Sequence, residues 1–149
     1  MKSTIIRLWT ALVLLFLLAG AAQAIMPPEV YATRSRESKI KAIATIVSVD
    51  LDQSTGENIV TFQTEFSLHK DTPVEFTGFC LSAVTEKQKN MVGGTIYFYP
   101  QEQERVFVTV SKDGGMITSM TLMTPELEKA IINTPEKLQY GISRVRIVD

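Results

Sequence analysis

The most constraining feature of the sequence is a pair of segments, between Ile59 and Ala83, in which apolar and polar residues alternate. In the first segment, one face carries Val60, Phe62, Thr64, Phe66 and Leu68. In the second segment, the matching face carries Val74, Phe76, Gly78 and Cys80. A repeat of two residues is typical of a β-strand with one buried face, and the link at residues 69–72 has the length of a hairpin loop. The sequence therefore predicts a β-hairpin at the centre of a small sheet or barrel.

Further strand-like segments flank this hairpin. Residues 40–51 are rich in β-branched residues and apolar on both faces, with Ile40, Ala42, Ala44 and Ile46 opposed to Ile43, Val47, Val49 and Leu51. This pattern is typical of a strand covered on both sides. Residues 95–100, 106–111 and 116–123 predict three more strands, and residues 142–148 predict a final edge strand.

Helix-start signals occur on both sides of these strands. A proline followed by an acidic residue predicts a short helix from Pro28 to about Glu37. Thr124 followed by Pro125 predicts a second start, Thr134 followed by Pro135 repeats it, and Gly141 predicts the stop. The expected fold class is mostly β: a single small OB-like β-barrel or curled antiparallel sheet with short N- and C-terminal helices.

The first 24 residues have the pattern of a cleaved secretory signal peptide. Lys2 and Arg7 precede an apolar run at residues 8–22, and Ala22-Gln23-Ala24 matches an A-x-A cleavage site. A membrane anchor is the alternative, but a spanning helix needs about 20 apolar residues and this run is shorter. We expect cleavage after Ala24, a single β-rich domain at residues 25–149 that does not span the membrane, and a periplasmic or secreted location.

Charge and cysteine content narrow the function classes. Residues 25–149 carry 13 Lys and Arg against 16 Asp and Glu, a net charge of −3, because the leader contributes Lys2 and Arg7 and no acid. This balance argues against nucleic-acid binding, which depends on basic patches that contact phosphates.

The only cysteine is Cys80, so no internal disulfide can support the fold in an oxidising compartment.

The order of elements resembles that of the netrin-like modules. The resemblance rests on the runs Ala44–Val49, Val60–Lys70, Val74–Cys80, Gly93–Tyr99 and Gly114–Ser119, within about residues 38–120. The netrin-like modules are OB-type barrels with flanking helices, also found in tissue inhibitors of metalloproteinases. Those inhibitors chelate the protease zinc through an N-terminal cysteine, and here Ile25 takes that place, so protease inhibition does not carry over. The resemblance implies a barrel used for binding.

The expected function is that of an exported, non-enzymatic binding or accessory module without a cofactor. Its partner would be an envelope or extracellular protein or glycan. OB-type barrels bind through the face of the second and third strands. That face nominates five ligand-binding residues: Thr61, Gln63, Glu65, Thr77 and Phe79. The alternative for each of them is a solvated sheet face.

Two other functions have weaker patterns. Soft sulfur ligands suit Cu(I), so a cell-envelope copper site could use Met116, Met120 and Met123 with Cys80 or His69. Methionine at this spacing also fills gaps in cores. A small secreted hydrolase would need Cys80 and His69 as a nucleophile and base. Cys80, however, shares a predicted apolar face with Phe76, where cysteine behaves as a small apolar residue.

Overall fold

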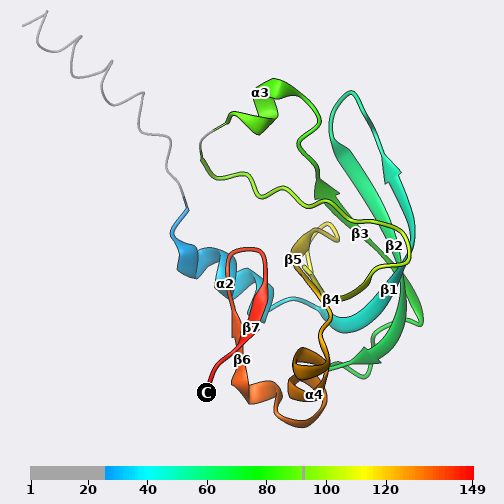
Figure 1. Ribbon diagram of the computed structural model, residues 1–149, viewed down its shortest axis with the longest axis vertical. Helices are drawn as coiled ribbons and strands as arrows, with labels where there is room; N and C mark the ends of the chain where they lie inside the picture. The colour runs from blue at the N-terminus through cyan, green and yellow to red at the C-terminus, as the bar shows by residue number, and fades with distance from the viewer. Residues whose placement is uncertain (1–25, 92) are drawn as a thin grey trace, which may run out of the picture.

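The computed structural model describes residues 26–91 and 93–149, so the predicted leader and its cleavage site lie outside the described residues. Within them, five strands form one antiparallel sheet in the order β3-β2-β1-β4-β5 (Figure 1). These strands are β1 (Ile40–Leu51), β2 (Glu57–Ser67), β3 (Glu75–Leu81), β4 (Arg105–Val110) and β5 (Ile117–Leu122). A hairpin of β6 (Leu138–Tyr140) and β7 (Val145–Ile147) forms a second sheet. The predicted mostly β fold and its central β2–β3 hairpin are confirmed.

Two helices and a 3-10 turn begin where the helix-start signals predict, whereas the short helix at residues 86–89 was not predicted. The helical elements are α2 (Pro28–Arg36), α3 (Glu86–Lys89), α4 (Pro125–Asn133) and a 3-10 turn, η1 (Pro135–Lys137). At the start of α4, Thr124 Oγ1 accepts a hydrogen bond from Leu127 N at 3.2 Å. The predicted helix stop at Gly141 is wrong, because this glycine lies in the loop between β6 and β7. The predicted strand at residues 142–148 forms as β7, but it pairs with β6 and not with the edge of the main sheet.

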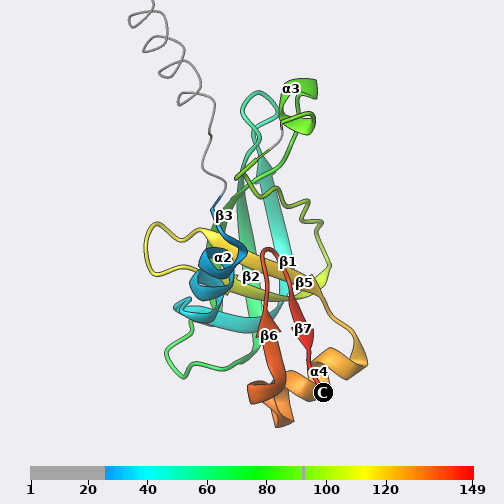
Figure 2. The same ribbon diagram turned by 90° about the vertical axis from the view of Figure 1, so that its left-hand side faces the viewer.

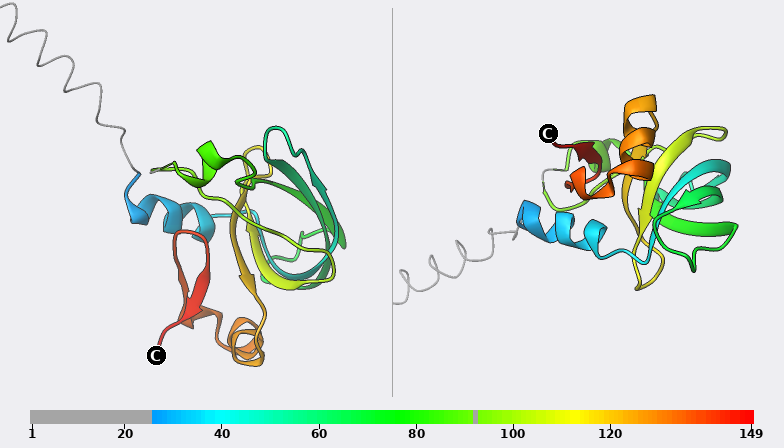
Figure 3. Two further views of the ribbon diagram at one scale, coloured as in Figure 1. Left: turned by 45° about the horizontal axis from the view of Figure 1, so that its top comes forward. Right: turned by 90° about the horizontal axis from the view of Figure 1, so that it is seen from below.

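The main sheet curls until its two outer strands meet at one point (Figure 3). Phe79 of β3 and Met116, beside β5, form an isolated parallel bridge, and Phe79 N donates to Gly115 O at 2.8 Å. Within residues 26–91 and 93–149, this is the one bridge between β3 and β5. The sheet therefore stays open along most of the length over which these two outer strands face each other. Elsewhere on the edge of β5, Ser35 Oγ of α2 donates to Thr118 O, and Met120 N donates to Ser143 O in the β6–β7 loop (Figure 2).

The segment from residue 95 to 100 was predicted as a strand, and this prediction is wrong. The segment is part of the connection from α3 to β4, which crosses from the end of β3 to the middle of β1, where Gln103 N donates to Ile46 O at 2.9 Å (Figure 1). Because it crosses the strands, it makes single bonds instead of a ladder: Phe98 N donates to Leu81 O at 2.8 Å. Buried Ser82 holds the crossing point, since its Oγ donates to Phe98 O and accepts from Asn58 Nδ2.

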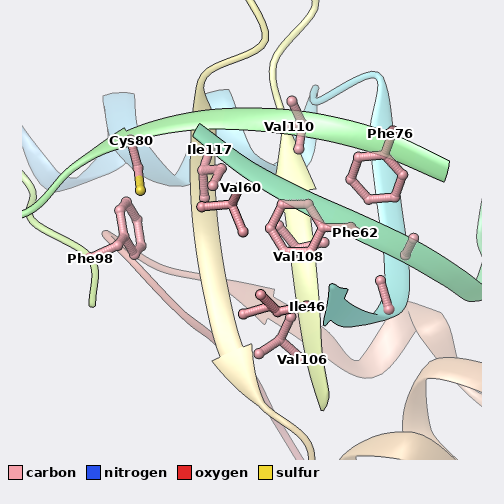
Figure 4. Packing of buried hydrophobic residues seen from close by; sticks show 12 residues of the cluster. Ile46, Val60, Phe62, Phe76, Cys80, Phe98, Val106, Val108, Val110 and Ile117 are labelled. Carbon is pink, nitrogen blue, oxygen red and sulfur yellow. The ribbon is translucent and has the colours of Figure 1, made fainter. Parts of the chain in front are cut away.

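Two hydrophobic clusters pack on opposite faces of the sheet. The inner cluster lies on the concave face and includes Phe62, Phe76, Cys80, Phe98, Val108 and Ile117 (Figure 4). The outer cluster lies between the convex face and the C-terminal elements, and includes Ile43, Phe107, Leu127, Ile131, Leu138 and Val145. β1 and β4 contribute to both clusters, which is why β1 is apolar on both faces, as predicted.

Extra residues in the strands change which face some side chains occupy. Glu65 is an extra residue of β2, since Ile43 pairs with Phe66 but Ala44 pairs with Thr64. A one-residue insertion moves all later side chains to the other face. Phe66 and Leu68 therefore pack against the outer cluster, and not on the face of Val60 as the alternation predicted. Val47 is a second extra residue, so Val49 joins the inner cluster instead of the face predicted for it.

Candidate functional site

A small apolar cavity lies where β3 and β5 approach each other. Its volume is about 260 Å³. Its walls come from α2, β3, the start of β5 and residues 94–98, which are Gly94 and the first part of the crossing segment. The side chains that matter most for its character are Tyr31, Phe79, Cys80, Ile96, Phe98 and Met116. Ligand sites in proteins are typically concave and mostly apolar with few polar groups, and this cavity has that composition.

Local interactions hold the walls of the cavity in place. The hydroxyl of Tyr31 donates to Gly94 O at 2.8 Å and so joins α2 to the crossing segment. Phe79 is held by its backbone bond to Gly115, in the turn that precedes β5. The cavity is therefore built from four segments that are distant in the sequence, and hydrogen bonds to the backbone carbonyls of Gly94 and Gly115 connect them in pairs.

The polar groups at the cavity differ in charge and in exposure to solvent. Burial raises the pKa of the Cys80 thiol to about 12, so the thiol is neutral at physiological pH. Figure 4 shows the Cys80 sulfur pointing toward Phe98. Arg34, in the last turn of α2, is exposed and lines the cavity, and it forms no ion pair with another residue in the described ranges. The cavity therefore combines an uncharged interior with one cation beside it.

The residues nominated from the sequence occupy the convex face of β2 and β3. Thr61 and Thr77 lie opposite each other in the register, and Phe79 lies opposite Ile59. Gln63 and Thr77 are exposed, whereas Thr61 and Phe79 are partly buried. The structure thus brings Thr61, Gln63, Thr77 and Phe79 to one face, and among these Phe79 also lines the cavity.

Glu65 differs from the other nominated residues because its carboxylate is already bound. Arg105 Nε donates to Glu65 Oε2 at 2.6 Å, and Thr45 Oγ1 donates to Glu65 Oε1 at 2.7 Å. The remaining nitrogens of Arg105 bind both oxygens of Glu128 in α4 at 2.7 and 2.8 Å. These bonds raise the pKa of Arg105 and lower the pKa of Glu128. Glu65 therefore links β2 through β4 to α4.

Of the residues of the copper alternative, only Met116 and Cys80 meet at the cavity, and the others lie elsewhere in the fold. Thr118 is an extra residue of β5, because Thr109 pairs with Ser119 while Val110 pairs with Ile117. The insertion places Met120 against the inner cluster, while Met116 is 46% exposed at the cavity. Met123 packs against the outer cluster. Met116 and Met120 are therefore not on one strand face, contrary to the predicted spacing.

The two residues of the hydrolase alternative are also apart. His69 lies in the loop between β2 and β3, whereas Cys80 lies near the other end of β3. At the rise of a β-strand, the five residue steps from Glu75 to Cys80 already span about 17 Å. The structure does not bring a thiol and an imidazole together at this position.

Several cavity residues were not nominated from the sequence. Tyr31 and Met26 precede the sheet, and Ile96 and Phe98 belong to a segment that was predicted as an ordinary strand. No local signal marks them, because they meet only after the sheet curls and the crossing segment closes its end. The sequence feature that lies nearest to the cavity is the double glycine at residues 93–94, because Gly94 O accepts a hydrogen bond from the Tyr31 hydroxyl.

A metal centre and a membrane-spanning helix are two further features that a functional site could use. Within residues 26–91 and 93–149, no three His, Cys, Asp or Glu side chains gather into a group that could hold a metal ion. None of the helices in these ranges has the length and apolar character to cross a membrane.

Comparison with known proteins returned no matching family model, no matching curated protein and no matching solved structure.

Proposed function

We propose that this protein is an exported, non-enzymatic binding module built on an OB-type barrel. The strand order supports this proposal, because β3-β2-β1-β4-β5 is the order of an OB-type barrel opened between β3 and β5. The parallel contact between Phe79 and Met116 lies at that opening. This arrangement is in keeping with the resemblance to netrin-like modules, and fold by itself does not decide function.

The cavity at the β3–β5 opening is the observation that carries the proposal. It joins the convex β2–β3 face through Phe79, which contributes to both. Its nucleophilic group, the Cys80 thiol, has its pKa raised to about 12 and is therefore a poor nucleophile at neutral pH. An apolar pocket without an activated nucleophile suits the binding of an apolar group better than catalysis.

The test is to fill the cavity and measure binding. Ile96→Trp adds a large side chain to the wall of the cavity, whereas Ile132→Trp adds the same side chain at an exposed position of α4. We expect an apolar fluorescent probe to bind the parent chain and Ile132→Trp, and to bind Ile96→Trp about tenfold more weakly. Circular dichroism checks that both variants are folded. Equal binding to all three chains would contradict a ligand site in this cavity.

The convex face needs its own variant, because a protein or glycan partner would use it. Gln63→Ala with Thr77→Ala removes two exposed polar side chains and leaves the Glu65–Arg105 link intact. Native mass spectrometry of the chain recovered from the cell envelope or medium, without chelators, would show any bound partner. Loss of a partner from the double variant would place it on this face, and loss from Ile96→Trp would place it at the cavity.

Copper(I) binding is a second candidate, favoured by one observation. Met26, Cys80 and Met116 line the same cavity, so three sulfur-bearing side chains surround one space. Three soft ligands suit Cu(I), and Cu(I) would displace the thiol proton despite the raised pKa. Titration against a Cu(I) chelator tests this candidate: Cys80→Ala and Met116→Leu should each weaken binding, and Met123→Leu should not. A parent chain that never competes with the chelator would exclude it.

A further inference from the structure

We propose that the cavity binds the hydrocarbon chain of a single-chain anionic amphiphile and that Arg34 binds its head group. This inference rests on the proposed binding function and names the ligand class for the same site. It follows from the size of the cavity, from the chemistry of its walls and from the position of the nearest cation.

The volume of the cavity limits the apolar part of the ligand. An engineered cavity of about 150 Å³ holds benzene, and one water-sized group takes about 30 Å³. A cavity of about 260 Å³ therefore accommodates roughly nine methylene-sized groups. This is too small for a sugar chain or a folded peptide segment, and it matches one medium-length alkyl chain.

The walls determine which end of such a ligand enters. Phe79, Ile96, Phe98 and Met116 offer apolar surface, and the Tyr31 hydroxyl already donates its hydrogen to Gly94 O. The Cys80 thiol is neutral and lies deep in the inner cluster. A charged head group in this interior would lose its hydration without a compensating partner, which is unfavourable. The hydrocarbon end must therefore enter first.

Arg34 supplies the partner for the head group outside the cavity. Its side chain lines the cavity and also the adjoining surface hollow formed with Glu37, Lys112 and Asp113. Neither of these two acids forms an ion pair with Arg34 in the described part of the chain, so the guanidinium is free to bind an anion. The backbone beneath it is held, since Arg34 O accepts a hydrogen bond from Ser38 Oγ at 2.8 Å. Guanidinium groups bind carboxylate and phosphate through two parallel hydrogen bonds.

Three probes with the same chain of about ten carbons, the length suggested by the volume, test the proposal. These are decanoate and decyl phosphate, each titrated calorimetrically below its micelle concentration, and decanol, titrated below its solubility limit. We expect the two anions to bind more tightly than the neutral alcohol, with affinity that falls as salt is added. The tighter anion shows whether the natural head group is a carboxylate or a phosphate.

Two arginines on the same helix provide the matched variants. Arg34→Gln should weaken decanoate binding about tenfold and leave decanol binding unchanged. Arg36→Gln is the control, because Arg36 is also exposed on α2 but bonds Thr33 and does not line the cavity. Both variants should retain the melting temperature of the parent chain.

The outcomes separate this inference from the function on which it rests. If decanol and decanoate bind equally and Arg34→Gln changes neither, the cavity binds apolar groups but the anionic ligand class is wrong. If no probe binds the parent chain, both the ligand class and the proposed cavity function are wrong. Binding that survives Ile96→Trp would place the ligand elsewhere and overturn both proposals.

Discussion

Cys80 lies on the inner face of β3, opposite Asn58 of β2, and is only 3% exposed. Burial raises the pKa of its thiol from an ordinary value near 9 to about 12. Between these two pH values, the unfolded chain has lost the thiol proton while the folded chain still holds it. The unfolded state then binds fewer protons, so the free energy of unfolding falls as the pH rises. The contribution of Cys80 to stability is complete below about pH 9.

This difference leads to a pH-dependent prediction. Urea unfolding should show that the parent chain loses about 1 kcal/mol more stability than Cys80→Ala between about pH 9 and about pH 10. The variant starts from a lower stability because it leaves a small hole in the inner cluster. The comparison of slopes removes the contribution of tyrosines and lysines, which both chains share. Parallel pH profiles for the two chains would contradict a raised thiol pKa.

Gly78 allows β3 and β5 to approach each other. A Cβ atom at this position would lie 2.7 Å from Ile117 Cγ1 and 3.3 Å from Phe62 Cε2. Gly78→Ala should therefore force the strands apart and lower the free energy of unfolding by about 1–3 kcal/mol. Chemical denaturation measures this loss. Gly114→Asn is the control, because no atom would lie within 4 Å of its Cβ and Asn tolerates the positive φ of +73°. Equal stability of Gly78→Ala and the parent would show that the opening can widen freely.

At the scale of elements, α2 docks on the sheet through a chain of hydroxyl groups. Ser38 Oγ donates to Arg34 O and is hydrogen-bonded to Thr118 Oγ1 at 2.7 Å. Thr118 Oγ1 also donates to Thr109 O at 3.1 Å, and Thr109 Oγ1 is hydrogen-bonded to Thr118 Oγ1 and to Ser119 Oγ, each at 2.6 Å. These bonds satisfy polar groups that α2 and the strands bury between them, and the sequence pattern did not predict them.

Thr118→Val tests this docking with a side chain of similar shape. It removes the hydrogen bonds of Thr118 to the hydroxyls of Ser38 and Thr109, which should cost about 1–3 kcal/mol for the two bonds together. Hydrogen exchange should show faster opening of α2 than of β1 in this variant. Thr77→Val, at an exposed position of β3, should change the free energy of unfolding by less than about 0.5 kcal/mol. Unchanged exchange in α2 would mean that other contacts hold the helix.

At the scale of the whole molecule, the inner and outer clusters share one pair of strands. Ile43 of β1 belongs to the outer cluster and Ile46 of the same strand to the inner cluster, and both are fully buried. Neither cluster can lose its packing without disturbing β1. We therefore expect the domain to unfold in one cooperative step, as single domains of this size usually do.

Two matched variants test this cooperativity. Ile43→Val and Ile46→Val should each lower the free energy of unfolding by about 0.5–1.5 kcal/mol and shift the same single transition. Exposed Ile132→Val should have little effect. Far-ultraviolet circular dichroism and the near-ultraviolet tyrosine signal should follow one curve in all chains. A second transition in either buried variant would show that the two clusters unfold independently.

Much of the architecture could be predicted from local patterns. Strands β1 to β5 and the starts of α2 and α4 follow from alternation, β-branched residues and caps, which act over a few residues. The convex face of Thr61, Gln63, Thr77 and Phe79 was also predictable, because β2 and β3 pair without a register shift from Glu57 to Gln63 and the alternation holds there. Beyond Glu65 the predicted faces of Phe66 and Leu68 were wrong, since an insertion depends on how two strands pair.

The sequence by itself therefore determined strands β1 to β5, the starts of α2 and α4, the apolar character of both faces of β1 and the single thiol. Tertiary structure alone decided where the extra residues fall, how the 95–100 segment crosses the strands and which side chains enclose the cavity. The physical reason is the distance along the chain over which each feature is set. Periodicity and capping depend only on residues that are neighbours in the sequence. The cavity depends on α2, β3, β5 and the crossing segment, which meet only when the sheet curls.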